Sequence, residues 1–262
     1  MSEDPVYHIK LTRAQVGGYV LMPGDRGRVE LIAKHLKAVR AMPPNREYLA
    51  MTGTLGGVPV TVMSSGMGSP AVAIGVEELR TLGVHTIIRV GTTGAVGPGP
   101  KLGDAIIAHG AVRSEGTSRA YVDLEVPAIA DLEVTVALRD AARAAKHPYH
   151  VGLVESSDAY YANTWLGEQA APRTERLRKA GLLAVEMEAA ALFIVGQLRG
   201  FRTGCILALR EEFARDGTRR QAGPAFERGL DAVIAIAVDA VRRLIRHDAK
   251  AKANATTKPR RR

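Results

Sequence analysis

Short apolar runs alternate with segments of helical periodicity along most of this chain, and this alternation restricts the fold more than any other feature. Residues 19–22, 85–91 and 202–209 are such runs and predict buried strands. Between the runs, apolar residues recur at the spacing of amphipathic helices. The pattern predicts an α/β fold with a largely parallel central sheet. Ligands of such sheets gather at the carboxyl ends of the strands, so polar residues there are candidates for a binding site.

Helix-start and helix-stop residues place several element boundaries. The segment 26–38 has helical spacing. Residues 69–82 predict a helix with Ser69 as its N-cap and Gly83 just past its end. The last long helix is expected over about residues 224–246.

The chain has 262 residues, and residues 1–246 are assigned to one domain. Residues 247–262 form a basic tail without large apolar side chains, which we expect to be disordered. This tail carries +5 of the net charge of +9. A basic tail could contact RNA or other polyanions without specificity. No RNA-binding motif or stacking aromatic residue accompanies it, so nucleic acid is not an expected partner.

Composition and the first residues bear on the cellular location. No apolar stretch reaches the length of about 18 residues that a membrane span requires. The first ten residues lack the charged-then-apolar pattern of a signal peptide. The only cysteine, Cys205, cannot form an internal disulfide. We therefore expect a cytoplasmic protein with no membrane partner.

One apolar strand carries a guanidinium group near its end. Arg89 lies in the run IIRV and is followed by Gly-Thr-Thr-Gly at residues 91–94. Arginine presents a planar fork of donors that suits phosphate. Thr92 and Thr93 add hydroxyl groups, and the glycines allow close approach of backbone N–H groups. This pattern fits an anion site. A strand end with a tight turn and a solvent-facing arginine explains the same residues equally well.

Two other strand ends also carry polar residues. The first predicted strand ends in Pro-Gly-Asp, with Gly24 at the turn and Arg28 in the following helix. A later strand ends at Glu186 and Glu188, and carboxylates in an apolar setting are costly unless they are used or paired. Either could instead only begin the next helix, where acids favour the helix dipole. Basic groups and carboxylates together suggest a ligand with an anionic part and a polyol part, yet the usual nucleotide-binding fingerprints are absent.

Several motifs occur in order along the chain: PGDRGRV, NREY, SSGMGSPAVAIGVEEL, RVGTTGAV, SSDAYY and VEMEAAALF. This set closely resembles the nucleoside phosphorylase family, which includes uridine phosphorylases, hexameric bacterial purine nucleoside phosphorylases, and archaeal purine or methylthioadenosine phosphorylases. The resemblance extends from about His8 to about Val241. It implies a single α/β domain with a central mixed, largely parallel sheet flanked by helices. It also implies a homo-hexamer, arranged as a trimer of dimers, with active sites shared between subunits.

The resemblance implies roles for individual residues in binding a nucleoside and inorganic phosphate, the co-substrate. Those expected at the phosphate are Gly24, Arg28, Arg46, Arg89 and Thr92. Those expected at the ribose are His8, Met187 and Glu188. Those expected at the base are Thr93, Gly94, Tyr160, Glu186 and Glu211. His8 and Arg46 would come from a neighbouring subunit. No cofactor or metal is expected, because Ala71 stands where some members carry a cation-binding serine.

The implied reaction is attack of phosphate on the anomeric carbon, with Arg89 and Glu211 as the catalytic residues. Uridine phosphorylases read uracil with a Gln-x-Arg pair, where this chain has Thr164 and Leu166. Purine-type archaeal members carry an aspartate after the last strand, where this chain has Glu211. These two departures favour a purine nucleoside, with Glu211 as the acid that protonates the leaving base. Alternatively, Glu211 only pairs with a nearby arginine such as Arg215.

Three other functions stay open at this point. A uridine phosphorylase would share every phosphate and ribose residue. A nucleosidase would share the fold and the ribose carboxylate but lack the phosphate arginines, all of which are present here. A non-catalytic nucleoside-binding protein would not need a phosphate site. We therefore expect phosphorolysis, with a purine nucleoside preferred.

Overall fold

The computed structural model describes residues 4–96, 99–161, 172–213 and 219–257. The helices are α1 (Gly27–Ala33), α2 (Ser69–Thr81), α3 (Thr117–Tyr121), α4 (Leu132–Ala144), α6 (Ala189–Arg199) and α7 (Pro224–Thr257), with a 3-10 turn η1 (Arg13–Gln15). The strands are β1 (Tyr19–Met22), β2 (Lys37–Ala41), β3 (Ala50–Leu55), β4 (Val58–Met63), β5 (Thr86–Ala95), β6 (Ala105–Ser114), β7 (Ala128–Ile129), β8 (Tyr149–Ser157), β9 (Leu182–Glu186), β10 (Arg202–Phe213) and β11 (Arg219–Gln221). Helices and strands alternate as the sequence predicts.

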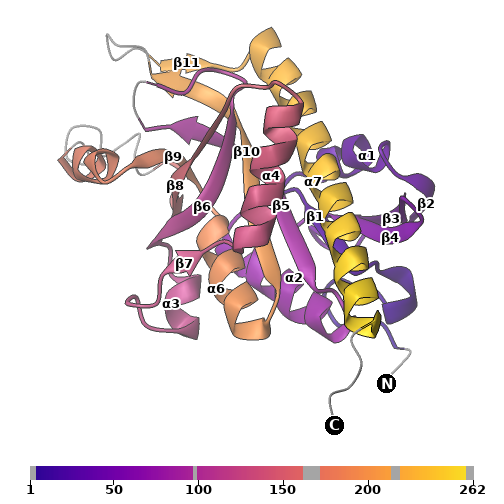
Figure 1. The fold of residues 1–262 in the computed structure, drawn as a ribbon. Helices are drawn as coiled ribbons and strands as arrows, with labels where there is room; N and C mark the ends of the chain where they lie inside the picture. Colours follow the sequence, from indigo (N-terminus) through magenta and orange to yellow (C-terminus); the bar gives the residue numbers. More distant parts are fainter. Residues whose placement is uncertain (1–3, 97–98, 162–171, 214–218, 258–262) are drawn as a thin grey trace.

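The strands form one mixed sheet in the order β11-β10-β6-β8-β9-β5-β1-β4-β3-β2. Because β10 also pairs with β5, the strands from β10 to β5 close on themselves (Figure 1). Parallel pairs join β4, β1, β5 and β10, and also β6, β8 and β9. The remaining pairs are antiparallel, including β5 with β9. The expected mixed α/β sheet is confirmed, with more antiparallel pairing than a largely parallel sheet would have.

Two hydrophobic cores lie on the two faces of this sheet, so successive strand residues enter different cores. Ile87 packs with α2 and α6, whereas Ile88 packs with α1, α4 and α7. Figure 1 shows α4 and α7 lying side by side. Helix α4 packs closely on β10 because Gly204 has no side chain: a Cβ atom there would lie 2.3 Å from a methyl carbon of Val134. No helix in the described part of the chain is long and apolar enough to cross a membrane.

Three predicted boundaries differ from the structure. The helix expected over 26–38 ends at Ala33, because the chain turns there into the edge strand β2. The Gly-Thr-Thr-Gly segment is not a turn: β5 continues through it to Ala95, paired with β10 on one side and β9 on the other. The last helix does not end near residue 246 but continues to Thr257, so residues 247–257 are helical rather than disordered.

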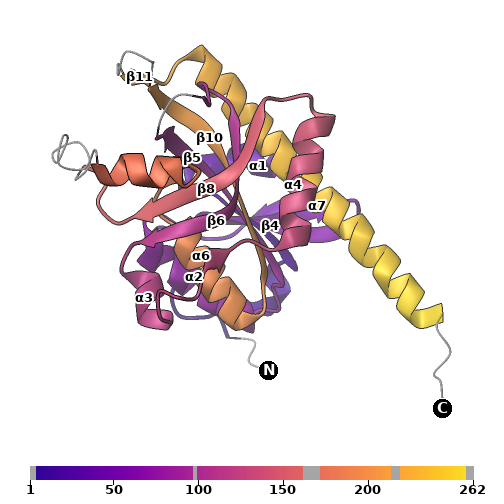
Figure 2. The ribbon, with the colours of Figure 1, turned by 60° about the vertical axis from the view of Figure 1, so that its left-hand side comes forward.

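The carboxyl end of α7 is held by a polar network around Asp248. Arg202 donates from Nη1 and Nη2 to the two carboxylate oxygens of Asp248, at 2.9 and 2.6 Å. The hydroxyl of Tyr19 donates to the same carboxylate at 2.5 Å. Burial opposes ionisation of Asp248, but its hydrogen bonds from Arg202 and Tyr19 lower its pKa to about 2. Beyond this anchor the helix projects away from the domain (Figure 2).

We predict that Asp248→Asn lowers the free energy of unfolding by about 1–2 kcal/mol, because an ion pair with two hydrogen bonds is weakened. Chemical denaturation near pH 7 would measure this, with the exposed Asp231→Asn on the same helix as the control. A depressed pKa stabilises the fold above the ordinary aspartate pKa of about 3.9 and ceases to do so as pH falls through the folded value. The difference between wild type and Asp248→Asn should therefore shrink from pH 4 toward pH 2. Equal stabilities at pH 7 would contradict the anchor.

Candidate active site

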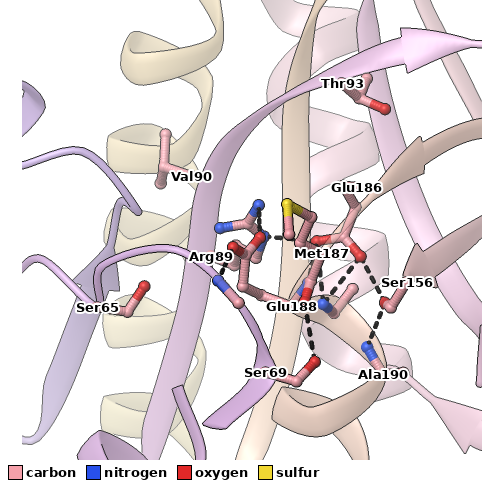
Figure 3. A network of polar contacts seen from close by, with 12 residues as sticks. Ser65, Ser69, Arg89, Val90, Thr93, Ser156, Glu186, Met187, Glu188 and Ala190 are labelled. Carbon is pink, nitrogen blue, oxygen red and sulfur yellow. Dashed lines mark hydrogen bonds and ion pairs between the residues drawn. The ribbon is translucent and has the colours of Figure 1, made fainter. Parts of the chain in front are cut away.

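The polar residues predicted at the strand ends converge where β1 and β5 meet the junction between β9 and α6 (Figure 3). Met22 at the end of β1 lies beside Arg89 in the sheet register. Arg89 projects toward the same face as Ile87, which is the face that α2 and α6 cover. On that face the junction places Glu186 and Glu188 next to the guanidinium group.

Arg89 is buried between these two carboxylates, with 5% of its surface exposed. Its Nε donates to Oε2 of Glu186 at 2.9 Å, and its Nη2 pairs with Oε2 of Glu188. Burial alone would lower the pKa of Arg89, but Glu188 and Glu186 together raise it, so the group stays cationic. Its close fit against β5 depends on Gly91, since a Cβ atom there would lie 2.9 Å from Nη2.

Glu186, a residue expected at the base, is bound by other protein groups in the structure. Its side chain has no exposed surface. Oε2 accepts from Arg89, and Oε1 accepts from the hydroxyl of Ser156 at 2.5 Å. Both oxygens also accept backbone N–H groups at the start of α6, from Glu188 and Ala189. The structure therefore surrounds this carboxylate with protein donors.

Glu188 is held by fewer groups. Its Oε1 accepts from the backbone N–H of Gly68 at 2.6 Å, and its Oε2 pairs with Arg89. Burial raises the pKa of Glu188, as does the charge of Glu186, whereas Arg89 lowers it.

The residue between the two glutamates, Met187, is half-buried beside this pair. Its backbone carbonyl accepts from the hydroxyl of Ser69 at 2.8 Å. This contact corrects the sequence prediction for α2. Ser69 is the first helical residue rather than the N-cap, which is Gly68, and its hydroxyl fixes Met187 instead of capping the helix.

A second guanidinium group lies beside the first. Arg28 donates from Nη1 to the carbonyl of Val90 at 3.2 Å, and its Nε lies 3.8 Å from a carboxylate oxygen of Asp25. Burial lowers the pKa of Arg28, and the positive charge of Arg89 lowers it further. A Cβ atom at Gly24 would lie 3.7 Å from Nη1 of Arg89. The structure thus brings Gly24, Arg28 and Arg89 together, and two neighbouring cations favour a bound anion. Thr92 follows Gly91 on β5 and is half-buried.

Asn45 connects His8 and Arg46 in the structure. His8 Nδ1 is 2.7 Å from a carboxylate oxygen of Glu78, and the carbonyl of His8 accepts from the side chain of Asn45 at 2.6 Å. Arg46 follows Asn45 with a positive φ of 52° and an exposed side chain. Within the described chain, no hydrogen bond or ion pair joins either residue to Arg28, Arg89 or Glu188.

The remaining base-site candidates lie where β5 pairs with β10. A bulge at Arg210 places Glu211 opposite Gly94, and a Cβ atom at Gly94 would lie 3.3 Å from a carboxylate oxygen of Glu211. The hydroxyl of Tyr160 donates to the other oxygen at 3.2 Å. The hydroxyl of Thr93 instead donates to the carbonyl of Val185 at 2.6 Å, which holds β5 to β9. Gly94, Tyr160 and Glu211 therefore form one group.

Some predictions about the base fall on undescribed residues. Thr164 and Leu166, at the positions of the uracil-reading pair, lie outside the described residues. Arg215, the alternative partner of Glu211, lies outside them as well.

Two site residues were missed in the sequence. Ser156 bonds to Glu186 and Gly68 bonds to Glu188. Sequence spacing could not reveal these contacts, because Ser156 lies 30 residues from its glutamate and Gly68 lies 120 residues from its own. Their only signal was membership of the motifs SSDAYY and SSGMGSP.

The described residues contain one group with metal-ligand geometry, formed by Glu133, His247 and Asp248. It lies at the amino ends of β5 and β10, away from Arg89. Arg202 Nη1 is already 3.3 Å from Glu133 and 2.9 Å from Asp248. This guanidinium supplies the positive charge that the carboxylates need, so the arrangement fits an ion-pair network better than a metal ligand set.

Comparisons with known proteins fit this geometry. Residues 19–246 match the family model described as the phosphorylase superfamily. A uridine phosphorylase of Thermococcus kodakarensis is 42% identical over 237 residues, which cover 86% of each chain. A uridine phosphorylase of Treponema pallidum is 42% identical over 260 residues, covering 94% of this chain and 97% of the relative.

A solved structure of a purine nucleoside phosphorylase also has a similar fold. The purine nucleoside phosphorylase of Toxoplasma gondii, in complex with immucillin-H, superposes with a TM-score of 0.85 at 28% identity. The match covers 94% of this chain and 99% of that one. The fold and the resemblance expected from the motifs are thereby confirmed. This chain belongs to the phosphorylase superfamily, as a pentosyltransferase of the nucleoside phosphorylase type.

Proposed function

We propose that the site cleaves the N-glycosidic bond of a nucleoside with inorganic phosphate, giving the free base and ribose 1-phosphate. The observation that carries this proposal is the convergence of Arg28 and Arg89 beside Gly24, with Glu188 next to Arg89. The two cations bind phosphate, with Thr92 as a further donor. The carboxylate of Glu188 accepts hydrogen bonds from the ribose hydroxyls, above Met187. A hydrolase would not need two guanidinium groups at this place.

Substrate binding exchanges the partners of Arg89. In the structure Glu188 occupies Nη2 of Arg89. Phosphate takes over that guanidinium edge, and Glu188 is released to accept the ribose hydroxyls. Separating the buried pair of Arg89 and Glu188 costs free energy. Each substrate binds one member of the pair, so the binding of one substrate favours the binding of the other. Glu186 stays in place, because four groups donate to it.

Catalysis then depends on positioning and electrostatics. Phosphate attacks the anomeric carbon through a transition state that resembles an oxocarbenium ion. The arginines hold the phosphate in line, and the phosphate charge stabilises the developing sugar cation. The protein itself need not supply a nucleophile.

We propose uridine as the nucleoside. The support is that two relatives at 42% identity, matched over most of their length, are uridine phosphorylases. A purine nucleoside is the second candidate, favoured by one observation. Glu211 lies opposite Gly94 and within hydrogen-bond distance of Tyr160, where it could protonate a leaving purine.

We further propose a homo-hexamer whose sites are completed by a neighbour. His8 and Arg46 are grouped at the surface, joined through Asn45, without a contact to the phosphate arginines of their own subunit. A neighbouring subunit can therefore receive both, with Arg46 reaching the phosphate and His8 the ribose.

Arg28→Ala should lower kcat/KM for phosphate by about 100-fold or more, as estimated for loss of a contact to a charged reactant. The exposed Arg26→Ala, two residues away, is the matched control and should stay within about two-fold of wild type. Steady-state kinetics at varied phosphate concentration measure both. Equal effects of the two substitutions would refute a phosphate role for Arg28.

A substrate panel tests the base. Uridine should be cleaved faster than inosine, guanosine or adenosine, and only when phosphate is present. Cleavage of uridine at the same rate without phosphate would identify a nucleosidase. If a purine nucleoside is faster, the second candidate replaces the first. In that case Glu211→Gln should lower kcat on natural purine nucleosides far more than on 7-methyl analogues, whose base leaves as a neutral group.

Complementation tests the sharing of sites. Arg28→Ala and Arg46→Ala subunits should each be nearly inactive alone. A mixed oligomer contains some sites that combine an intact Arg28 from one subunit with an intact Arg46 from its neighbour, so mixing should restore activity. Co-expressed subunits with different affinity tags allow purification of mixed oligomers. No recovery in those oligomers would place both arginines in the same subunit's site.

A further inference from the structure

Ser156 lies at the carboxyl end of β8 and is the residue through which β8 contacts the Arg89 site (Figure 3). Its hydroxyl is buried and donates to Oε1 of Glu186 at 2.5 Å. The hydroxyl oxygen of Ser156 in turn accepts from the backbone N–H of Ala190 at 2.8 Å. Ser156 thus joins the end of β8 to both the carboxylate and the first turn of α6.

Glu186 in turn fixes the plane of the Arg89 guanidinium. The donors to Glu186 other than Ser156 are Arg89 itself and backbone groups of the adjoining turn. Apart from Arg89 itself, Ser156 is therefore the one donor to this carboxylate, among the described residues, that comes from outside the adjoining turn. Without it, Oε1 of Glu186 keeps only the backbone N–H of Ala189 as a donor, so the carboxylate is less restrained about its last torsion.

A rotation of Glu186 would alter where the remaining nitrogen of Arg89 points. Nε is bound to Glu186 and Nη2 to Glu188, whereas Nη1 lies on the side of Gly24. Because guanidinium is planar and rigid, the Nε hydrogen bond sets the direction of Nη1. That direction decides whether Arg89 and Arg28 can hold one phosphate together.

We propose that Ser156 is a positioning residue for phosphate: through Glu186 it holds Arg89 at the angle that phosphate binding requires. This inference rests on the proposed phosphorolysis and deepens it. It differs from a purely structural role, in which Ser156 would only stabilise the start of α6. A structural role would affect the binding of both substrates and the folded state together, whereas positioning acts first on phosphate.

The test compares Ser156→Ala with Ser157→Ala, the same change one residue along β8 on the opposite face of the strand. We expect Ser156→Ala to raise the KM for phosphate about ten-fold, as estimated for loss of one hydrogen bond to a charged group. The KM for the nucleoside should stay within about two-fold of wild type. Ser156→Thr keeps the hydroxyl and should recover most of the phosphate affinity. Ser157→Ala should resemble wild type.

Two results would overturn the proposal. One is equal behaviour of Ser156→Ala and Ser157→Ala. The other is a parallel rise of both KM values with a lower melting temperature, which indicates a structural role. If Ser156→Ala does not fold, Ser156→Cys provides the test, since a thiol has nearly the same shape but donates weakly. The same split between the two KM values is then expected, and its absence overturns the proposal.

Calorimetry separates this proposal from the proposed function. Binding of inorganic phosphate alone is measured for wild type and for each folded variant. If wild type binds phosphate but cleaves no nucleoside, the proposed reaction fails, and weaker phosphate binding by Ser156→Ala still supports the positioning role. Unchanged phosphate binding in Ser156→Ala overturns that role. A wild-type protein that neither binds phosphate nor cleaves nucleosides contradicts both.

Discussion

The buried charge of Arg89 is the constraint around which the site is organised. A guanidinium group with so little exposed surface is costly unless it is paired and hydrogen-bonded. Two carboxylates from one short segment, at Glu186 and Glu188, meet this requirement. They can do so only because β9 runs antiparallel to β5 and turns into α6 on the face toward which Arg89 points. Sheet topology, helix start and buried charge therefore depend on one another.

The two carboxylates are not equivalent, and their difference suits them to different tasks. Glu186 is satisfied by a serine and by backbone groups in addition to Arg89, so displacing it would leave several donors without partners. Glu188 is bound by Arg89 and by backbone groups of Gly68 and Met187, and in the proposed exchange phosphate takes its place at Arg89 while ribose hydroxyls bind the freed carboxylate oxygen. A fixed counter-charge and an exchangeable one allow the empty site to stay folded while remaining open to its ligands. The proposed exchange thus follows from the hydrogen-bond partners of each glutamate.

The opposite end of the sheet carries a second polar network with a different purpose. Tyr19 at the start of β1 and Arg202 at the start of β10 both bind Asp248, which anchors α7 across the amino ends of these strands. Burial and the hydrogen bond to Asp248 raise the pKa of Tyr19 to about 12, so the phenol stays a donor. The Arg89 site lies at the carboxyl ends of the strands, and the network that anchors α7 lies at their amino ends. The residues that hold α7 in place therefore do not occupy the candidate site.

The sequence by itself determined the α/β class and the family, and it predicted an anion site near the end of β5, because periodicity and local motifs are written in consecutive residues. It placed the end of α7 wrongly because residues 247–257 lack large apolar side chains, whereas Asp248 gains its partners from β1 and β10. It also assigned Glu186 to the base, because the sequence cannot show that Ser156 and Arg89 occupy its oxygens. Only the tertiary structure decided which groups bind each glutamate, since those hydrogen bonds join segments distant along the chain.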